Sequence, residues 1–277
     1  MKPRKNWCKT RMNYWAKPSP RSGASDKEFN MPYSLSGTLN ISRQDMLNRL
    51  RDLDVTSNNL ANVNTAGYKA NRSNFQEMLN QRLEDGTRLV ATQLMPMQGS
   101  LRNSDKPLDW AIQGEGFFSV TLPNGDTGYT RDGQFTLDAE RNIVNANGYP
   151  LVWEGEIPED TTDIIIQPDG TVIALNADGE SADIGAIQLT RFPNPSGLTG
   201  YGDNVWLESD ASGAAQGGDP GTENFGIIAS HKVEESNVDL SRELTHLITL
   251  QRSFGMSLAA FQQTDMMISQ AINLRKA

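Results

Sequence analysis

Two histidines, one cysteine and a glycine-containing run are the parts of this chain best suited to catalytic or metal chemistry. His231 and His246 fall on different predicted elements, and Cys8 is the only cysteine among the 277 residues. A metal centre built from His and Cys needs three or four such ligands, so we expect no metal site. Residues 114–118 (GEGFF) lack the third glycine of a dinucleotide-binding loop and its strand-to-helix context. They predict a turn, and we expect no cofactor.

Carboxylates are the other candidate groups, because residues 104–232 hold 21 Asp and Glu. A glycosidase needs two of them about 5–10 Å apart in a cleft. A calcium-binding EF-hand needs a spacing that this chain lacks. Most of these aspartates lie in or beside predicted turns, where Asp stabilises the backbone; they are Asp126, Asp132, Asp169, Asp178, Asp203, Asp210 and Asp219. With no P-loop, HExxH or GxSxG motif, we expect no catalytic residue and no enzyme.

Two segments have the residue spacing of long amphipathic helices, one toward each end of the chain. From Leu39 onward apolar residues recur at helical spacing, and residues 42–45 (SRQD) fit a capping box. This helix should end through the asparagines of residues 58–62, with Gly67 as the terminator. Toward the C-terminus the same spacing continues for about 35 residues after a start signal at residues 236–239.

An apolar seam along each helix predicts that the two helices pair. A helix with a narrow apolar stripe needs a partner helix, and the two terminal seams are each other's nearest candidates. Gln251 and Asp265 interrupt the C-terminal seam, either to specify register or because they face outward. The predicted subunit-packing residues are Leu50, Leu53, Leu60, Leu240, Leu244, Leu247, Phe254, Leu258, Phe261 and Ile268.

The middle of the chain changes to the periodicity of strands. Short apolar runs are separated by Asx-Gly pairs, which supply the positive φ of hairpin turns. The predicted strands cover residues 118–122, 135–137, 149–153, 164–166, 171–175, 187–189, 205–207 and 226–230. The predicted turns are Asn124-Gly125, Asp132-Gly133, Asn147-Gly148, Asp169-Gly170 and Asp178-Gly179. No strand–helix alternation appears, so we predict an α+β fold with an antiparallel all-β central domain, built as a sandwich or barrel.

These patterns together predict a nested organisation. Residues 31–66 and 236–277 form a terminal helical domain in which the helices pair like a coiled coil. Residues 104–235 form a β-rich outer domain, and residues 67–103 form a linker or extended connector. Within the connector we expect a helical piece around Phe75, Met78, Leu79 and Leu83.

The net charge of −9 is unevenly distributed along the chain. Residues 1–30 hold eight basic and two acidic residues, whereas residues 104–232 hold five and 21. The absence of a basic stripe on a folded domain argues against nucleic-acid binding, and no stretch approaches the roughly 20 apolar residues of a membrane span. The leader, residues 1–30, is predicted to be disordered and lacks the apolar core of a secretory signal. We interpret it as an extension upstream of a native start at Met31, with a presequence as the alternative.

Four blocks of sequence resemble, in order, those of the bacterial flagellar rod and hook proteins. Residues 58–69 read NNLANVNTAGYK, which is similar to the N-terminal motif of that family. Residues 107–118 and 129–135 resemble the start of its β domain and the block that follows. Residues 235–240, together with residues 251–254, resemble its C-terminal block. The motif residues are Asn58, Asn59, Leu60, Ala61, Asn62, Gly67 and Tyr68. The resemblance covers residues 35–277.

The resemblance implies a structural subunit of the flagellar basal body. In this family the terminal helices pack as an inner tube around the export channel, and the β domain lies outside. The subunits polymerise helically into a hollow shaft that transmits torque for motility. The implied partners are further copies of the chain, other rod and hook subunits, the surrounding ring proteins and the type III export apparatus. That apparatus carries the subunits past the inner membrane without a cleaved signal peptide.

Within the family, residues 194–198 (NPSGL), 202–204 (GDN) and 273–276 (NLRK) are most similar to distal rod subunits. Many distal rod proteins carry an extra segment before the block at residues 99–118, which this chain and proximal rod subunits lack. A proximal rod subunit or another hook–basal-body subunit is therefore the alternative within the family. A secreted enzyme or adhesin with an acidic β domain is the alternative from another class.

Overall fold

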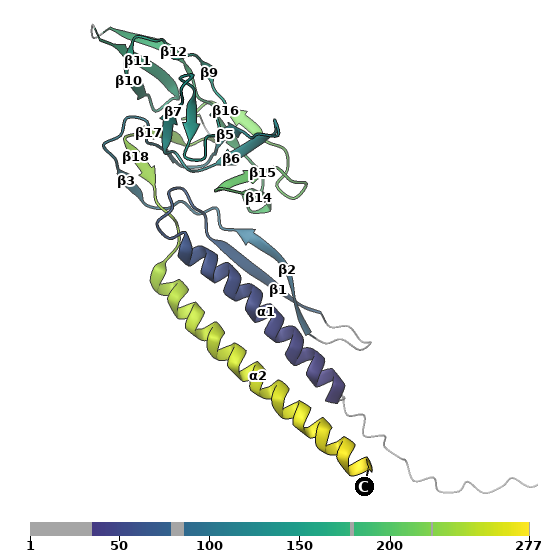
Figure 1. The fold of residues 1–277 in the computed structure, drawn as a ribbon. Helices are drawn as coiled ribbons and strands as arrows, with labels where there is room; N and C mark the ends of the chain where they lie inside the picture. The colour runs from purple at the N-terminus through teal and green to yellow at the C-terminus, as the bar shows by residue number, and fades with distance from the viewer. Residues whose placement is uncertain (1–34, 79–85, 178–179, 223, 277) are drawn as a thin grey trace, which may run out of the picture. The chain divides into compact units, whose positions relative to one another are not determined.

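The computed structural model describes residues 35–276 except 79–85, 178–179 and 223 (Figure 1). In chain order, helix α1 (Leu35–Ala61) is followed by a succession of strands and then by helix α2 (Leu240–Lys276). The fold is therefore α+β, as predicted from the sequence. The predicted leader and the pair Asp178-Gly179 lie outside the described residues.

Helix α1 ends where the sequence predicts but begins earlier. It ends at Ala61, inside the asparagine-rich stretch whose side chains compete for backbone hydrogen bonds. The predicted capping box at residues 42–45 is wrong, because α1 already begins at Leu35 and Ser42 lies inside it. The carboxylate of Asp45 accepts a hydrogen bond from Ser257 on α2 instead of capping its own helix.

Helix α2 begins at the predicted start signal. The side chain of Asp239 accepts hydrogen bonds from the backbone N–H groups of Ser241 at 2.9 Å and Arg242 at 3.1 Å. These contacts satisfy donors that have no partner inside the helix, which is the usual role of an N-cap aspartate. The helix then continues for 37 residues, close to the predicted length.

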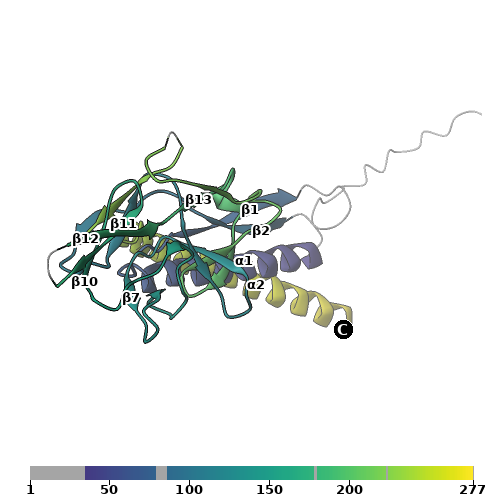
Figure 2. The same ribbon diagram turned by 90° about the horizontal axis from the view of Figure 1, so that it is seen from above.

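The two helices lie side by side and run in opposite directions (Figures 1 and 2). Asp45 in the first half of α1 contacts Ser257 in the middle of α2, whereas Asn59 near the end of α1 contacts Glu243 near the start of α2. The hydrogen bonds and the ion pair between the helices join polar side chains of α1 to α2. Of the predicted seam residues of α1, Leu53 and Leu60 are half-buried, whereas Leu50 is 44% exposed.

The described strands are all antiparallel to their partners. Two sheets have four strands each, in the orders β10-β11-β12-β9 and β14-β15-β6-β5, and the others are two-stranded. The strands are β1 (Asn71–Met78), β2 (Gly86–Leu94), β3 (Leu101–Asn103), β4 (Trp110–Gln113), β5 (Phe118–Thr121), β6 (Thr127–Thr130), β7 (Phe135–Leu137), β8 (Ile143–Asn145), β9 (Glu154–Gly155), β10 (Thr161–Ile166), β11 (Thr171–Asn176), β12 (Ser181–Ala186), β13 (Leu189–Arg191), β14 (Thr199–Gly202), β15 (Val205–Leu207), β16 (Gln216–Gly218), β17 (Ile227–Ser230) and β18 (Lys232–Glu234), with a short 3-10 helix η1 (Pro195–Gly197).

Most of the predicted strands are confirmed, namely β5, β7, β10, β11, β15 and β17. The strand predicted at residues 149–153 is wrong, because that stretch makes only single bridges, at Pro150 and Leu151, between neighbouring elements. The strand predicted at residues 187–189 begins two residues later, at Leu189. Short strands such as β3, β4 and β18 carry no alternating pattern of their own and pair only with distant segments.

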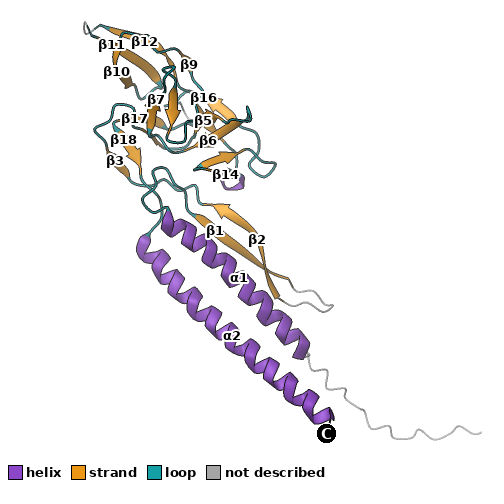
Figure 3. Cartoon of the chain, in the orientation of Figure 1, coloured by secondary structure: helices purple, strands orange, loops and turns teal. Residues whose placement is uncertain are grey.

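The segment after α1 forms a β-hairpin rather than the predicted helical piece. Strands β1 and β2 pair in register from Asn71 with Leu94 to Met78 with Gly86. The hairpin contacts α1 (Figure 3). The prediction at Phe75 and Met78 is wrong because cross-strand pairing outweighs a weak helical spacing. Leu79 and Leu83 lie outside the described residues.

The core of the β part is made by large apolar side chains from many short strands. Trp110, Phe118 and Phe135 are almost fully buried, and their rings make edge and tilted contacts at 5.3 Å between centroids. A second cluster gathers Phe117, Tyr129, Phe192 and Trp206 with Leu94 of β2. Leu94 therefore joins the hairpin to the β part.

The glycines of the predicted turns are required for different physical reasons. Gly125, Gly148 and Gly170 have φ between +82° and +91°, as expected for Asx-Gly turns. Gly133 does not have a positive φ, so that prediction is wrong. Gly133 is needed for space, because a Cβ placed there would lie 1.6 Å from the carbonyl oxygen of Trp110.

Replacing Gly133 with Ala should therefore destabilise the protein by about 3 kcal/mol or more, since the buried backbone of Trp110 must move. Gly200→Ala is the matched control, because nothing lies within 4 Å of its Cβ position. That change should stay within about 1 kcal/mol. Urea unfolding of both variants tests the difference, and equal midpoints would contradict the packing argument.

Candidate functional site

The motif, residues 58–69, covers the last turn of α1 and the loop after it, at the junction between the helices and the β part. Asn59 is buried and uses both ends of its amide. Its Oδ1 accepts from the backbone N–H of Asn71 at 2.9 Å and from the hydroxyl of Tyr68 at 3.3 Å. Its Nδ2 donates to the carbonyl of Asn71 at 2.9 Å and to Glu243 at 3.4 Å. One side chain therefore links α1, β1 and α2.

The other motif residues close the end of the helix. The side chain of Asn62 donates to the carbonyl of Asn58 at 2.9 Å and accepts from Thr65 at 3.1 Å. Gly67 has φ +63°, and its N–H donates to the carbonyl of Glu234 at 2.7 Å. A Cβ at Gly67 would lie 2.4 Å from the Arg131–Asp132 peptide, so only glycine fits there.

A buried ion cluster lies beneath this loop. Lys69 Nζ lies 2.5 Å from Glu234 Oε1 and donates to the carbonyl of Met97 at 2.8 Å. Glu234 Oε1 also accepts the N–H of Gly99 at 2.9 Å. Arg131 Nη1 lies 3.4 Å from Glu234 Oε2. The side chains of Lys69 and Glu234 are 1% and 0% exposed, so these charges are stable there only as partners of one another.

Burial dominates the electrostatics of both cations. Desolvation lowers the pKa of Lys69, and the neighbouring Glu234 carboxylate acts in the opposite direction. Desolvation likewise lowers the pKa of Arg131, again opposed by Glu234. Arg131 also donates to the carbonyl of Gly114 at 2.8 Å, and its guanidinium lies 5.3 Å from the centre of the Phe117 ring. Glu234 thus has one cation from the motif and one from the β part.

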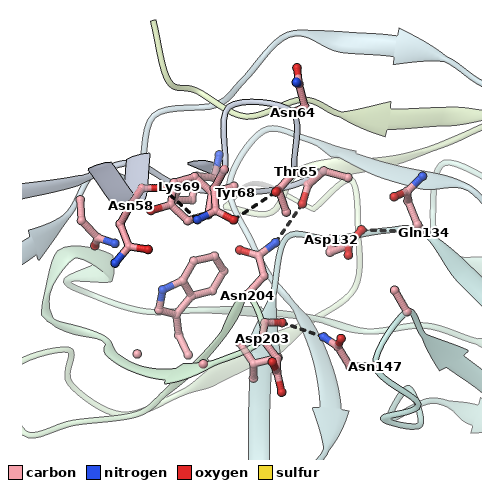
Figure 4. Close-up of a pocket in the computed structure, with 18 residues that line it drawn as sticks. Asn58, Asn64, Thr65, Tyr68, Lys69, Asp132, Gln134, Asn147, Asp203 and Asn204 are labelled. Atoms are coloured by element: carbon pink, nitrogen blue, oxygen red, sulfur yellow. Dashed lines mark hydrogen bonds between the residues drawn. The ribbon is translucent and has the colours of Figure 1, made fainter. Parts of the chain in front are cut away.

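A polar cavity of about 600 Å³ opens beside the cluster, between the motif loop and the β14–β15 turn (Figure 4). Asn204 in that turn donates to the carbonyl of Ala66 at 2.8 Å. Burial raises the pKa of the Asp132 carboxyl from 3.8 to about 6. A hydrogen bond from the backbone N–H of Gln134 opposes the rise, and the nearby Asp109 adds to it. The lining holds amides and no nucleophile–base pair.

The structure brings the predicted motif residues together. Asn58, Asn59, Leu60, Ala61, Asn62, Gly67 and Tyr68 all belong to the end of α1 or to the loop on the ion cluster. Burial raises the pKa of the Tyr68 hydroxyl, in keeping with its place inside the junction. The ion pairs that join Lys69 and Arg131 to Glu234 were not predicted from the sequence. Each of these residues lies in or next to a recognised block, but nothing in one sequence pairs them.

The predicted packing residues divide into two groups. Leu53, Leu60, Leu247, Phe254, Phe261 and Ile268 are half-buried within the chain. Leu50, Leu240, Leu244 and Leu258 expose between 38% and 47% of their surface. The exposed members lie outside the contact between α1 and α2.

The two histidines do not form a site with each other. His246 Nε2 lies 3.3 Å from Asp52 Oδ2 across the helix pair, and His231 lies in the turn between β17 and β18. Among the described residues, no group of three or more His, Cys, Asp or Glu could hold a metal ion. Within the same residues, no helix has the length and apolar character needed to cross a bilayer.

Comparison with known protein families supports the resemblance at three places. Residues 42–69 match the model described as "Flagella basal body rod protein". Residues 111–174 match "Flagellar hook protein FlgE/F/G D1 domain", and residues 229–274 match "Flagellar basal body rod FlgEFG protein C-terminal".

Similar proteins are found in distant bacteria. "Flagellar basal-body rod protein FlgG" of Caulobacter vibrioides is 38% identical over 246 residues, which cover 81% of this chain and 94% of the relative. The chain belongs to the flagellar basal-body rod protein family. The rod proteins FlgG of Borreliella burgdorferi and Bacillus subtilis are 32% and 33% identical, covering 81% and 83% of this chain and 93% and 96% of theirs. A solved structure of the Helicobacter pylori flagellar hook protein FlgE2 aligns with 60% of this chain and 34% of that one, at 12% identity. Its TM-score of 0.22 is too low for a conclusion on fold.

Family membership gives the junction its context. The first matched stretch of this rod-family chain covers most of α1 and ends at Lys69, and the last includes Glu234 and most of α2. The match between them includes Arg131. The three charged side chains of the cluster thus come one from each matched stretch of the rod protein.

Breaking the buried pair should be costly. Lys69→Met leaves the Glu234 carboxylate buried with only the more distant Arg131, so we expect a loss of about 3–5 kcal/mol in urea unfolding. Arg102→Met is the matched control, because Arg102 pairs with Glu235 on the surface, where it is 60% exposed. That change should cost under about 1 kcal/mol. Similar losses in both variants would argue against the cluster.

Asp132 should give the protein a pH-dependent stability. Its folded pKa of about 6 lies above its unfolded value of 3.8, so the folded state keeps a proton that the unfolded state releases. This contribution is complete below pH 3.8 and is lost as the pH rises through 6. The loss is on the order of 3 kcal/mol. Asp132→Asn keeps an acceptor for Gln134 and should gain this amount over wild type at pH 7 but not at pH 4. Unfolding curves that differ equally at both pH values would contradict the assignment.

Proposed function

We propose that this chain is a structural subunit of the flagellar basal-body rod and that it polymerises through its terminal helices. Its relatives of similar length are named flagellar basal-body rod protein FlgG. The apolar surface of α2 is the observation that carries the assembly step. Of the 17 large apolar residues exposed within the described part of the chain, nine lie on α2.

The exposure pattern of α2 favours contact with further copies of the chain. The exposed residues lie on more than one face of the helix: Leu240, Leu244, Ile248, Met256, Leu258, Met266, Met267, Ile272 and Leu274. A helix that is apolar on several faces is usually buried on several faces. The intramolecular contact with α1 covers only one of them. The remaining faces fit the helices of neighbouring copies, in a coiled-coil-like arrangement.

The domain organisation follows from the same proposal. Residues 31–66 and 236–277 form the axial part of the polymer, residues 67–103 connect it, and residues 104–235 form the outer part. The charge distribution supports this order, because residues 104–232 carry five basic and 21 acidic residues while the helical segments are close to neutral. Strong like charge would oppose close packing of copies at the axis and favours a solvated outer surface.

Within the family we favour the distal rod, with a proximal rod or other hook–basal-body subunit as the alternative. The role is structural and not enzymatic. The polymer would serve as the hollow shaft that transmits torque and carries the export channel. Other rod and hook subunits, ring proteins and the type III export apparatus would be its partners, and the basal body outside the inner membrane its location. Similarity of residues 194–198 and 202–204 to distal rod subunits supports this choice.

A charge among the exposed apolar residues of α2 should block assembly without unfolding the chain. Leu258→Asp replaces a side chain that is 38% exposed, so the stability should change little. In the polymer that position would be buried, and an unpaired carboxylate there should abolish polymerisation and swimming. Swimming is measured by complementation of a deletion strain.

Leu137→Asp is the matched control, because Leu137 on β7 has the same exposed fraction of 38%. It should leave swimming unchanged. Normal motility of the Leu258→Asp variant would contradict the proposed interface. Loss of motility in both variants would contradict its location on α2.

Electron microscopy of hook–basal bodies from a deletion strain addresses the position in the rod. Basal bodies whose assembly stops after the inner rings would support a rod role. The point at which assembly stops would distinguish a proximal from a distal rod subunit. Complete basal bodies, together with a stable monomer that binds glycans, would instead favour the secreted enzyme or adhesin.

A further inference from the structure

The buried face of α1 is polar, the reverse of the usual amphipathic pattern. Its buried residues are Ser42, Asn48, Asp52, Thr56 and Asn59, each exposed by 9% or less. By contrast, Leu47 and Leu50 on the same helix are 41% and 44% exposed. A helix that only needed a stable contact with α2 would bury its leucines instead.

Three polar contacts join α1 to α2 at intervals of seven residues. Asp45 accepts a hydrogen bond from Ser257, Asp52 Oδ2 lies 3.3 Å from His246 Nε2, and Asn59 donates to Glu243 at 3.4 Å. Seven residues correspond to two helical turns in a coiled coil, so Asp45, Asp52 and Asn59 lie on one face of α1. We call these three residues the polar row.

The facing side of α2 is mostly apolar. Apolar side chains make up five of its nine buried and half-buried positions, which are Glu243, Leu247, Leu250, Ser253, Phe254, Ser257, Phe261, Thr264 and Ile268. Apolar contacts are not directional, so they alone would tolerate α1 sliding along α2. The polar contacts are directional, and a shifted register would take from the buried Asp52 and Asn59 their partners on α2. Asp45 is 29% exposed and also pairs with Arg49 of its own helix.

We propose that the polar row specifies the register of α1 on α2, and that it thereby selects which apolar residues are presented to a second copy of the chain. Polar residues inside a helix–helix seam are known to specify register at a cost in stability. In the register observed, Leu47 and Leu50 of α1 and Leu244 and Leu258 of α2 stay outside the contact. The second part of this proposal rests on the proposed function, because it takes the partner to be another copy.

The register can be measured on the monomer by pulsed electron paramagnetic resonance. Spin labels are placed at Arg51→Cys on α1 and Arg252→Cys on α2, both exposed, in a Cys8→Ser background. The test variant is Asp45→Leu/Asp52→Leu, which spares Asn59 because that residue also holds the junction. The rescue variant is Asp45→Asn/Asp52→Asn, which keeps the acceptors. The control is Arg43→Leu/Asp54→Leu, which adds two leucines at exposed positions of α1.

Wild type, rescue and control should each show one narrow distance. The test variant should keep its helix content by circular dichroism and show a second population, displaced along the helix by about 10 Å, the rise of seven residues. An unchanged single distance in the test variant, or a broad distribution in wild type or in the rescue variant, would overturn the proposal. Should the double variant lose helix content, Asp52→Leu alone carries the same comparison. Because the monomer is measured, failure here is distinguishable from failure of polymerisation.

Discussion

The buried carboxylate of Glu234 is the contact on which the arrangement of this chain depends. It meets Lys69 from the loop after α1, Arg131 from the β part, and the backbone of Gly99. A buried ion pair contributes little stability compared with well-packed apolar residues, but it strongly penalises any arrangement that separates the charges. Glu234 therefore fixes the position of the motif loop relative to Arg131, which directly follows β6. Glu234 lies six residues before the start of α2, so the same contacts also hold the start of that helix near the motif loop.

The two helices that extend from this junction have an unusual distribution of polar and apolar side chains. The side of α1 toward α2 carries hydrogen-bonding groups, and large apolar residues of both helices are left in water. For an isolated protein this is unfavourable, since exposed apolar surface on this scale marks an interaction site. In the polymer that we propose, this arrangement would separate two tasks. Polar contacts would organise the single chain, and the exposed apolar residues would join neighbouring copies. The β part differs, because most of its large apolar residues lie in two buried clusters and its segments carry many carboxylates.

The fold class and several local features could be predicted from the sequence, whereas most contacts between distant segments could not. The start of α2 at Asp239 and the glycine turns at Gly125, Gly148 and Gly170 depend on neighbouring residues, so their patterns were sufficient. The hairpin of β1 and β2 was missed because pairing between strands decided the conformation of Phe75. The exposure of Leu50 beside the half-buried Leu53 could not be predicted, because apolar periodicity marks a face that needs covering but not what covers it. The meeting of Lys69, Arg131 and Glu234 has no local signal, although the motif pointed to the correct loop.

The sequence separation inside the junction has a consequence for the order of folding. Lys69 and Glu234 are 165 residues apart, and Ala70 and Asn237 are 167 apart. Contacts of such separation form only after the entropy of closing the intervening chain has been lost. The motif loop cannot be completed while the C-terminal segment is still missing or extended. A partly emerged chain thus has no finished junction, and the helix pair can adopt its final geometry only when the last part of the polypeptide arrives.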